Sequence, residues 1–242
     1  MLLDNARRYL HEIAHKFPEP EFYQVHRKET ARAHEIDRSS PLVAASRKLI
    51  EARGDPCGHG FDHARKVAID AAAIVYAEMG NNHSADCLAA DALLAGYLHD
   101  IKRDQKAHPQ KAAEFFEHHF KDEMDPEQIE MISFAIRNHE AFVEPVTTAD
   151  PHKKLLSDAL YDADKFRWGP DNFLYTIWDM AASMNLTPRQ IIDGYDHGIR
   201  GIQRIRNTFR TQTGQKFGPG FIDIGLMMGE ELINYLQEGI DT

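Results

Sequence analysis

Helix-start signals recur along this chain, and they constrain its fold more than any other feature of the sequence. Four capping residues are each followed directly by a proline and then by an apolar pattern of helical period: Ser40-Pro41, Asp125-Pro126, Asp150-Pro151 and Thr187-Pro188. A Ser, Thr or Asp side chain caps the free backbone N–H groups of a helix start, and proline fits the first turn because its missing N–H is not needed there. The one strand-like stretch, Phe142 to Thr148, is short and contains Pro145, which cannot donate to a sheet ladder. The sequence therefore predicts an all-α protein.

The apolar periodicity places the individual helices. We predict an amphipathic stripe from Leu3 to Phe17 and helices from Pro41 to about Arg53, Asp62 to Met79, Ser84 to about Asp100, Pro109 to Phe120, Pro126 to about Asn138, Pro151 to Phe166, Pro188 to about Arg210, and Asp223 to Gln237. A loop is expected at 54–60. No repeat, low-complexity segment or obvious linker divides the chain, so we expect an N-terminal helical extension at 1–38 and one domain at 39–242.

Charge and cysteine content limit the partners. The chain has 28 Lys and Arg against 38 Asp and Glu, a net charge of −10, which argues against general nucleic-acid binding. An anionic substrate would have to be attracted locally, by a metal ion or a few cations. The two cysteines, Cys57 and Cys87, form no disulfide framework and fit a reducing cytoplasm. No apolar run approaches the ~18 residues of a membrane span, so we expect no membrane partner.

The pair His99-Asp100 is unusual because it ends an almost wholly apolar helix in a chain with 14 histidines. A charged Asp is rarely buried unless it is paired or binds a metal. Three other His or Asp features lie at predicted helix ends: His63, His139 and the segment Asp162-Ala163-Asp164. A mixed His and Asp set suits a divalent ion such as Mn, Fe, Co, Ni or Zn. Individually, each of these residues could equally be a helix-capping residue.

The order of these features resembles the HD superfamily of metal-dependent phosphohydrolases, and within it the bacterial YedJ-like branch. The matching elements are His63-Ala64-Arg65-Lys66-Val67, Leu98-His99-Asp100-Ile101, His108-Pro109, Ala135-Ile136-Arg137-Asn138-His139 and Asp162-Ala163-Asp164-Lys165-Phe166. They occur in the family's order over residues 59–167, whereas 1–38 and 211–242 are not covered. After Phe166 the chain continues Arg167-Trp168-Gly169-Pro170 in place of the small residues usual there.

The resemblance implies an HD-domain helical bundle and a divalent metal ion (Mn, Fe, Co, Ni, Zn or Mg). It implies that the metal ligands are His63, His99, Asp100 and Asp164. Asp162 is the less suitable of the two neighbouring acids, because the family's ligand directly precedes the basic residue. The expected activity is hydrolysis of a nucleotide or another small phosphate ester by metal-activated water.

Further roles follow from the same resemblance. If the helix continues past Asp100, Asp104 lies on the same face one turn along and is the candidate general base. The candidate phosphate-binding residues are Arg65, His108, His139 and Lys165. Solvated surface charges are the alternative for Asp104, Arg65 and Lys165, and helix-end residues are the alternative for the two histidines.

Two other functions compete with the hydrolase. The segment His11-Glu12-Ile13-Ala14-His15 matches the H-E-x-x-H signature of zinc proteases, but a helical wheel turns both histidines away from the apolar stripe, and no third ligand follows. Alternatively, His108 and His139 would hold a second iron, as in HD proteins that resemble inositol oxygenase. A non-catalytic binding module would normally lose part of the ligand set, which is complete here.

Overall fold

Two buried helices, α5 (Phe61–Met79) and α6 (His83–Leu98), pack against each other at the centre of the fold. Their alanine-rich surfaces approach closely: a Cβ at Gly96 would clash with the Cα of Ala68. Gly96 therefore lets the end of α6 approach α5. The computed structural model describes residues 2–54 and 59–241, and all regular secondary structure in these residues is helical, which confirms the all-α prediction.

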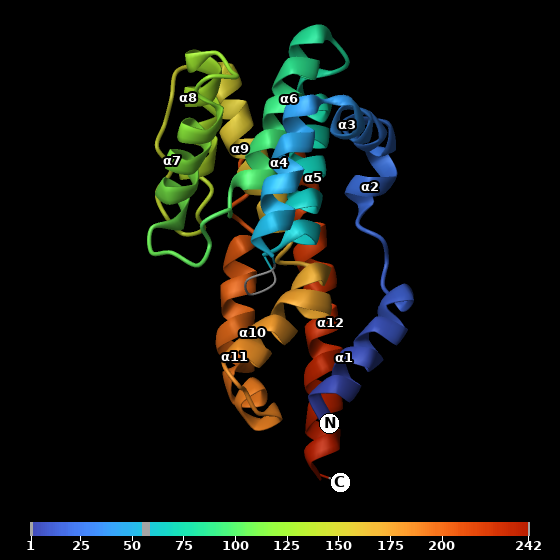
Figure 1. Cartoon of the computed structure of the whole chain (residues 1–242). Helices are drawn as coiled ribbons and strands as arrows, with labels where there is room; N and C mark the ends of the chain where they lie inside the picture. The colour runs from blue at the N-terminus through green and yellow to red at the C-terminus, as the bar shows by residue number, and fades with distance from the viewer. Residues whose placement is uncertain (1, 55–58, 242) are drawn as a thin grey trace.

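Other helices surround this pair (Figure 1). They are α3 (Arg27–Ser39), α4 (Pro41–Arg53), α7 (His108–Phe120), α8 (Pro126–Arg137) and α9 (Pro151–Phe166). In Figure 1, α7 and α8 lie on one side of the central pair, and α2 (Glu21–Val25) and α3 lie on the other. α9 packs against both α5 and α8, so the ends of α5, α6, α8 and α9 meet near one point.

A second group of helices extends below the central pair in Figure 1. It comprises α1 (Leu2–Ile13), the 3-10 turn η1 (Ala14–Lys16), the π-helical turn η3 (Asn172–Thr176), α10 (Ile177–Ser183), α11 (Pro188–Ile205) and α12 (Gln212–Asp241). α12 packs against α11, α9 and α1, and the two chain ends lie at the same end of the molecule. None of the helices in residues 2–54 and 59–241 has the length and apolar character that a membrane crossing requires.

The predicted helix starts are confirmed by their caps. The Ser40 hydroxyl accepts from the Val43 N–H, and the Asp125 and Asp150 carboxylates accept from the first backbone N–H groups of α8 and α9. Thr187 and Gln190 form a reciprocal capping box at α11. These caps are local interactions, which is why the sequence alone indicated them.

Several predicted boundaries are wrong. The last helix begins at Gln212 and not at Asp223, and it runs through Pro219. Within this helix, Gly214 and Gly218 lie where a Cβ would clash with Asp162 and with Phe209. Their role is close packing within a helix.

The other differences concern ends and omitted elements. α11 ends at Ile205 and α6 at Leu98, earlier than predicted. The helices at 21–39 lie almost wholly within the predicted helical extension at 1–38 but were not placed individually, and those at 172–183 were not predicted. The segment 142–148 forms no strand. Most of the predicted loop at 54–60, together with Cys57, lies outside the described residues.

Candidate metal centre

The ends of three central helices bring the candidate ligands together. His63 lies in the first turn of α5, His99 and Asp100 follow α6 directly, and Asp164 lies in the last turn of α9. His139, just after α8, and His59, just before α5, approach the same point. Residues spread over 59–164 of the chain thus form one buried cluster.

Three ligand atoms lie at the spacing that a shared ion requires. The Nε2 atom of His63 lies 3.4 Å from His99 Nε2 and 3.4 Å from Asp164 Oδ1, and His99 Nε2 lies 3.7 Å from the same oxygen. Ligand atoms held ~2.0–2.2 Å from a zinc-like ion are separated by roughly 3–3.5 Å. This group therefore fits a divalent ion with little rearrangement.

Asp100 completes the cluster and faces histidines on both sides. Its Oδ2 lies 3.5 Å from His99 Nε2 and 3.9 Å from His59 Nε2. Its Oδ1 lies 3.3 Å from His108 Nε2 and 3.4 Å from His139 Nε2, yet this buried oxygen makes no hydrogen bond. A buried carboxylate oxygen without a hydrogen bond is costly, and coordination of a cation would satisfy it.

Backbone carbonyl groups orient two of the imidazoles. His99 Nδ1–H donates to Gly96 O at 2.8 Å, and His139 Nδ1–H donates to Ile136 O at 2.6 Å. Each bond leaves the Nε2 lone pair directed at the cluster, as is usual for metal-binding histidines.

The protonation states of His63, His139, Asp100 and Asp164 also suit metal binding. Burial lowers the pKa of His63 to about 4 and also lowers that of His139, so both imidazoles are neutral at pH 7. Burial opposes the ionisation of Asp164, but the Lys165 ammonium and the neighbouring His63 and His99 side chains outweigh it and hold the pKa well below the usual range. The pKa of Asp100 is likewise held low, chiefly by His99. Neutral imidazoles and ionised carboxylates are the forms that bind metals. His99 differs, because its burial is outweighed by Asp100 and Asp164, which raise its pKa, so a metal ion competes with a proton for this imidazole.

The structure separates the two neighbouring acids on α9. Asp162 points away from the cluster and accepts hydrogen bonds from the backbone N–H groups of Arg210 and Thr211 and from the Thr211 hydroxyl. This carboxylate therefore helps to anchor the start of α12, and Asp164 alone of the two approaches His63.

The residues predicted to bind phosphate or to act as general base divide into those that lie at the cluster and those that are exposed. His108 and His139 contact Asp100, and the buried Lys165 ammonium forms an ion pair with Asp164. Arg65 is exposed on α5 and lies outside the residues that line the adjoining cavity. Asp104 is also exposed, because α6 ends at Leu98 and a turn carries Asp104 outward, where its Oδ1 lies 3.6 Å from Arg53 Nη2.

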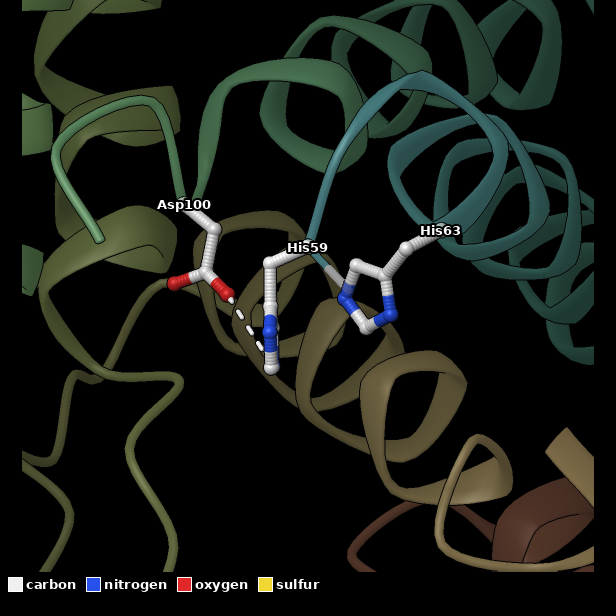
Figure 2. A group of neighbouring side chains, drawn as sticks. All are labelled: His59, His63 and Asp100. Carbon is white, nitrogen blue, oxygen red and sulfur yellow. Dashed lines mark ion pairs between the residues drawn. The ribbon is translucent and has the colours of Figure 1, made fainter. Parts of the chain in front are cut away.

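Sequence analysis did not identify His59 as a candidate ligand. Figure 2 shows His59, His63 and Asp100 directed toward one another, with the His59–Asp100 ion pair dashed. The spacing of four residues between His59 and His63 was the available signal, but the glycines around His59 predicted only a loop. Arg103 was also missed; its guanidinium lies 2.9 Å from His108 Nε2 and 3.8 Å from Asp100 Oδ1.

A cavity of about 560 Å³ opens from this cluster. Its inner end is lined by His59, His63, Asp100, His139 and Asp164, together with the cationic side chains of Arg103, Lys165 and Arg167. Its size falls within the ~300–1,000 Å³ range of small-molecule sites. The candidate metal centre is thus accessible to a small substrate and has cations beside it.

The H-E-x-x-H segment does not form a comparable site. α1 ends at Ile13, so His11 and His15 do not share one α-helix, and His11 Nε2 lies 3.1 Å from Leu174 O. Among the described residues, neither histidine belongs to a group that could hold a metal.

Comparisons with protein-family models, with curated proteins and with solved structures find no match for this chain.

Proposed function

We propose that this protein is a metal-dependent phosphohydrolase of the HD type that acts on a nucleotide or another small phosphate ester. One observation carries the proposal: His63, His99, Asp100 and Asp164 converge at the inner end of a cavity, with ligand atoms at the spacing that a shared ion requires. A divalent ion, when bound, lowers the pKa of a coordinated water toward ~7 and polarises a phosphoryl oxygen. His and Asp donors in this mixture suit Mn, Fe, Co, Ni or Zn, and the resemblance to the HD family adds Mg.

The surrounding residues supply what phosphate binding requires. Arg103 and Lys165 bring positive charge to the cavity's inner end, in a protein whose net charge is −10. They attract the phosphate locally and stabilise the charge that develops on its oxygens. His59 lines the cavity beside Asp100, and we assign it the acceptance of the proton from the attacking water. Asp104 has no part in this proposal, because it lies on an exposed turn.

A second candidate function rests on the unbonded Asp100 oxygen. His99, Asp100 and His139 form a group of ligand atoms that could hold an ion, and His108 Nε2 lies 3.3 Å from Asp100 Oδ1, so a second ion could be held on this side of Asp100. A di-iron oxygenase would use such an arrangement. Two irons per chain, with oxygen consumed in the presence of a small organic substrate, would favour it over the hydrolase.

The deciding experiment measures metal content and phosphate release together. The protein is loaded with Mn, Co, Ni or Mg and screened against nucleotides and small phosphate esters, with and without oxygen. We expect His63→Ala and Asp100→Ala to abolish metal binding and phosphate release while the protein remains helical by circular dichroism. An oxygen-independent reaction supports the hydrolase.

The matched control is His11→Ala, which removes a histidine outside the cluster. It should retain both the metal and the activity. Unchanged metal content in Asp100→Ala would refute the ligand assignment, and loss of metal and activity in His11→Ala would favour a protease-like site. The proposal includes a reducing cytoplasmic setting, consistent with the free thiol of the exposed Cys87.

A further inference from the structure

The outer half of the cavity is apolar, in contrast to its inner end. Its wall is built from η3, α10, α11 and the segments beside them. The apolar lining residues are Phe142, Trp168, Phe173, Ile177, Met180, Leu186, Ile191, Ile199 and Ile202. Phe142 and Met180 are 46% and 44% exposed, which is unusual for large apolar side chains that lie together.

One face of α11 forms the floor of this apolar half. Ile191, Tyr195, Gly198 and Ile202 recur at the spacing i, i+4, i+7 and i+11, which places them on one helix face. A Cβ at Gly198 would meet no atom within 4 Å. Packing within the protein therefore does not require glycine there, and its effect is to let the cavity reach the helix backbone.

The charged residues of α11 lie outside the cavity. Arg189, Asp193, Asp196, Arg200 and Arg204 belong to the same helix, yet none of them is among the lining residues, and neither is Asp179 of α10. The Arg204 guanidinium lies 4.1 Å from the centre of the Phe142 ring. The polar lining groups in this half are those of Asn172, Thr176, Gln190 and Tyr195, and the exposed Glu140, which directly follows His139 in the chain, also lines the cavity. A sugar would bury several hydroxyl groups against a mainly apolar wall, at a cost for each one left without a hydrogen bond.

We propose that the substrate is a phosphate monoester of a hydrocarbon alcohol, with its phosphate at the candidate metal centre and its hydrocarbon between η3, α10 and α11. This inference rests on the proposed hydrolase function and narrows its substrate class. Water attacks phosphorus, a new P–O bond forms and the P–O bond to the alcohol breaks. The alcohol leaves with one proton, and inorganic phosphate is the second product.

The test compares n-butyl phosphate with n-octyl phosphate as probes of the manganese-loaded protein. Calorimetry measures binding, and a phosphate assay measures hydrolysis. Each buried methylene strengthens binding roughly three- to fourfold, so octyl phosphate should bind on the order of 100-fold more tightly than butyl phosphate. Adenosine monophosphate, whose ribose is polar, should bind more weakly than octyl phosphate.

Gly198→Leu tests the position of the hydrocarbon. The new side chain projects into the cavity and should weaken octyl phosphate binding by at least about tenfold, with the metal content unchanged. The matched control is Gly201→Leu, on the same helix and also with nothing within 4 Å of its Cβ, but outside the cavity lining. It should bind octyl phosphate as the unmodified protein does. Both substitutions improve helix propensity, so neither is expected to unfold α11.

Equal affinity for the butyl and octyl esters, or preference for adenosine monophosphate, would overturn the inference even if Gly198→Leu failed to fold. Hydrolysis of short esters with no dependence on chain length would leave the hydrolase proposal standing and refute this one. Chain-length-dependent binding of octyl phosphate without hydrolysis under any metal would refute the hydrolase proposal and support the apolar site.

Discussion

Replacing Arg167 by Met should destabilise the protein strongly, because it would leave a buried carboxylate without its partner. Arg167 directly follows α9 and is 6% exposed. Its Nη2 donates to Asp70 Oδ2 on α5 at 2.5 Å and to the Tyr23 hydroxyl on α2 at 2.9 Å, and its Nη1 donates to Asp171 Oδ2 at 2.5 Å. This guanidinium therefore joins three segments and docks part of the N-terminal extension.

The size of the stability loss depends on the Asp70 carboxylate that remains buried after Arg167 is replaced. Removing one partner of a buried ion pair costs about 3–5 kcal/mol, whereas replacing both partners is often close to neutral. For a chain of this length each kcal/mol corresponds to roughly 2 °C in melting temperature, so Arg167→Met should melt about 6–10 °C lower. Arg167→Met combined with Asp70→Asn should recover a large part of that loss, because Asp70 is then uncharged and Asp171 keeps its ion pair with Lys66.

The stability loss caused by Arg167→Met should also depend on pH. Burial raises the pKa of Asp70 to about 6 even though Arg167 lies beside it, and without the guanidinium that pKa rises further. The folded state then holds a proton that the unfolded state has lost, so stability falls as pH increases above the pKa of the unfolded carboxyl, about 4. Arg167→Met should therefore be more destabilising at pH 8 than at pH 5.5.

Urea denaturation of Arg167→Met, Asp70→Asn and the double variant at both pH values measures these effects as a double-mutant cycle. A coupling energy above about 1 kcal/mol is expected for groups in direct contact. Additive single effects, or a loss of stability for Arg167→Met that does not change with pH, would refute the argument that an uncompensated Asp70 charge causes the loss.

Two further predictions concern other buried groups. Burial raises the pKa of Asp91 to about 7 although Gln128 donates a hydrogen bond to it, so this carboxyl lowers the stability of the fold increasingly as pH rises from about 4 to 7. Asp91→Asn can still accept from Gln128, and it should remove that pH dependence and raise the melting temperature at pH 8. A lower melting temperature of Asp91→Asn at pH 8 would contradict this prediction. If His139 binds phosphate, His139→Ala should lower turnover by ~10²–10³ while one metal ion is retained. A fall from two bound ions to one would instead indicate the two-ion site. Unchanged turnover per folded molecule would contradict both roles.

The helix starts and the residue types of the site could be predicted from the sequence, because both depend on residues that are close together in the chain. Asp150 caps α9 by binding N–H groups two and three residues away, so its role is readable without any tertiary contact. The contrast of Asp100 with the apolar helix before it is equally local. This contrast indicates a buried charge that needs interaction partners, but it does not identify which residues these are.

The tertiary structure decided which residues meet and which face solvent. Asp104 and Arg65 lie close to ligands in sequence but are exposed, because the direction of a side chain depends on where a helix ends and on what packs against it. His59 joins the cluster, and α11 supplies an apolar wall to a candidate site whose His and Asp residues lie far earlier in the chain. α12 extends back to Gln212 because Gly214 packs against Asp162, a contact between segments about 50 residues apart. Such long-range contacts depend on the shapes of two surfaces at once, and no local pattern of residues encodes both.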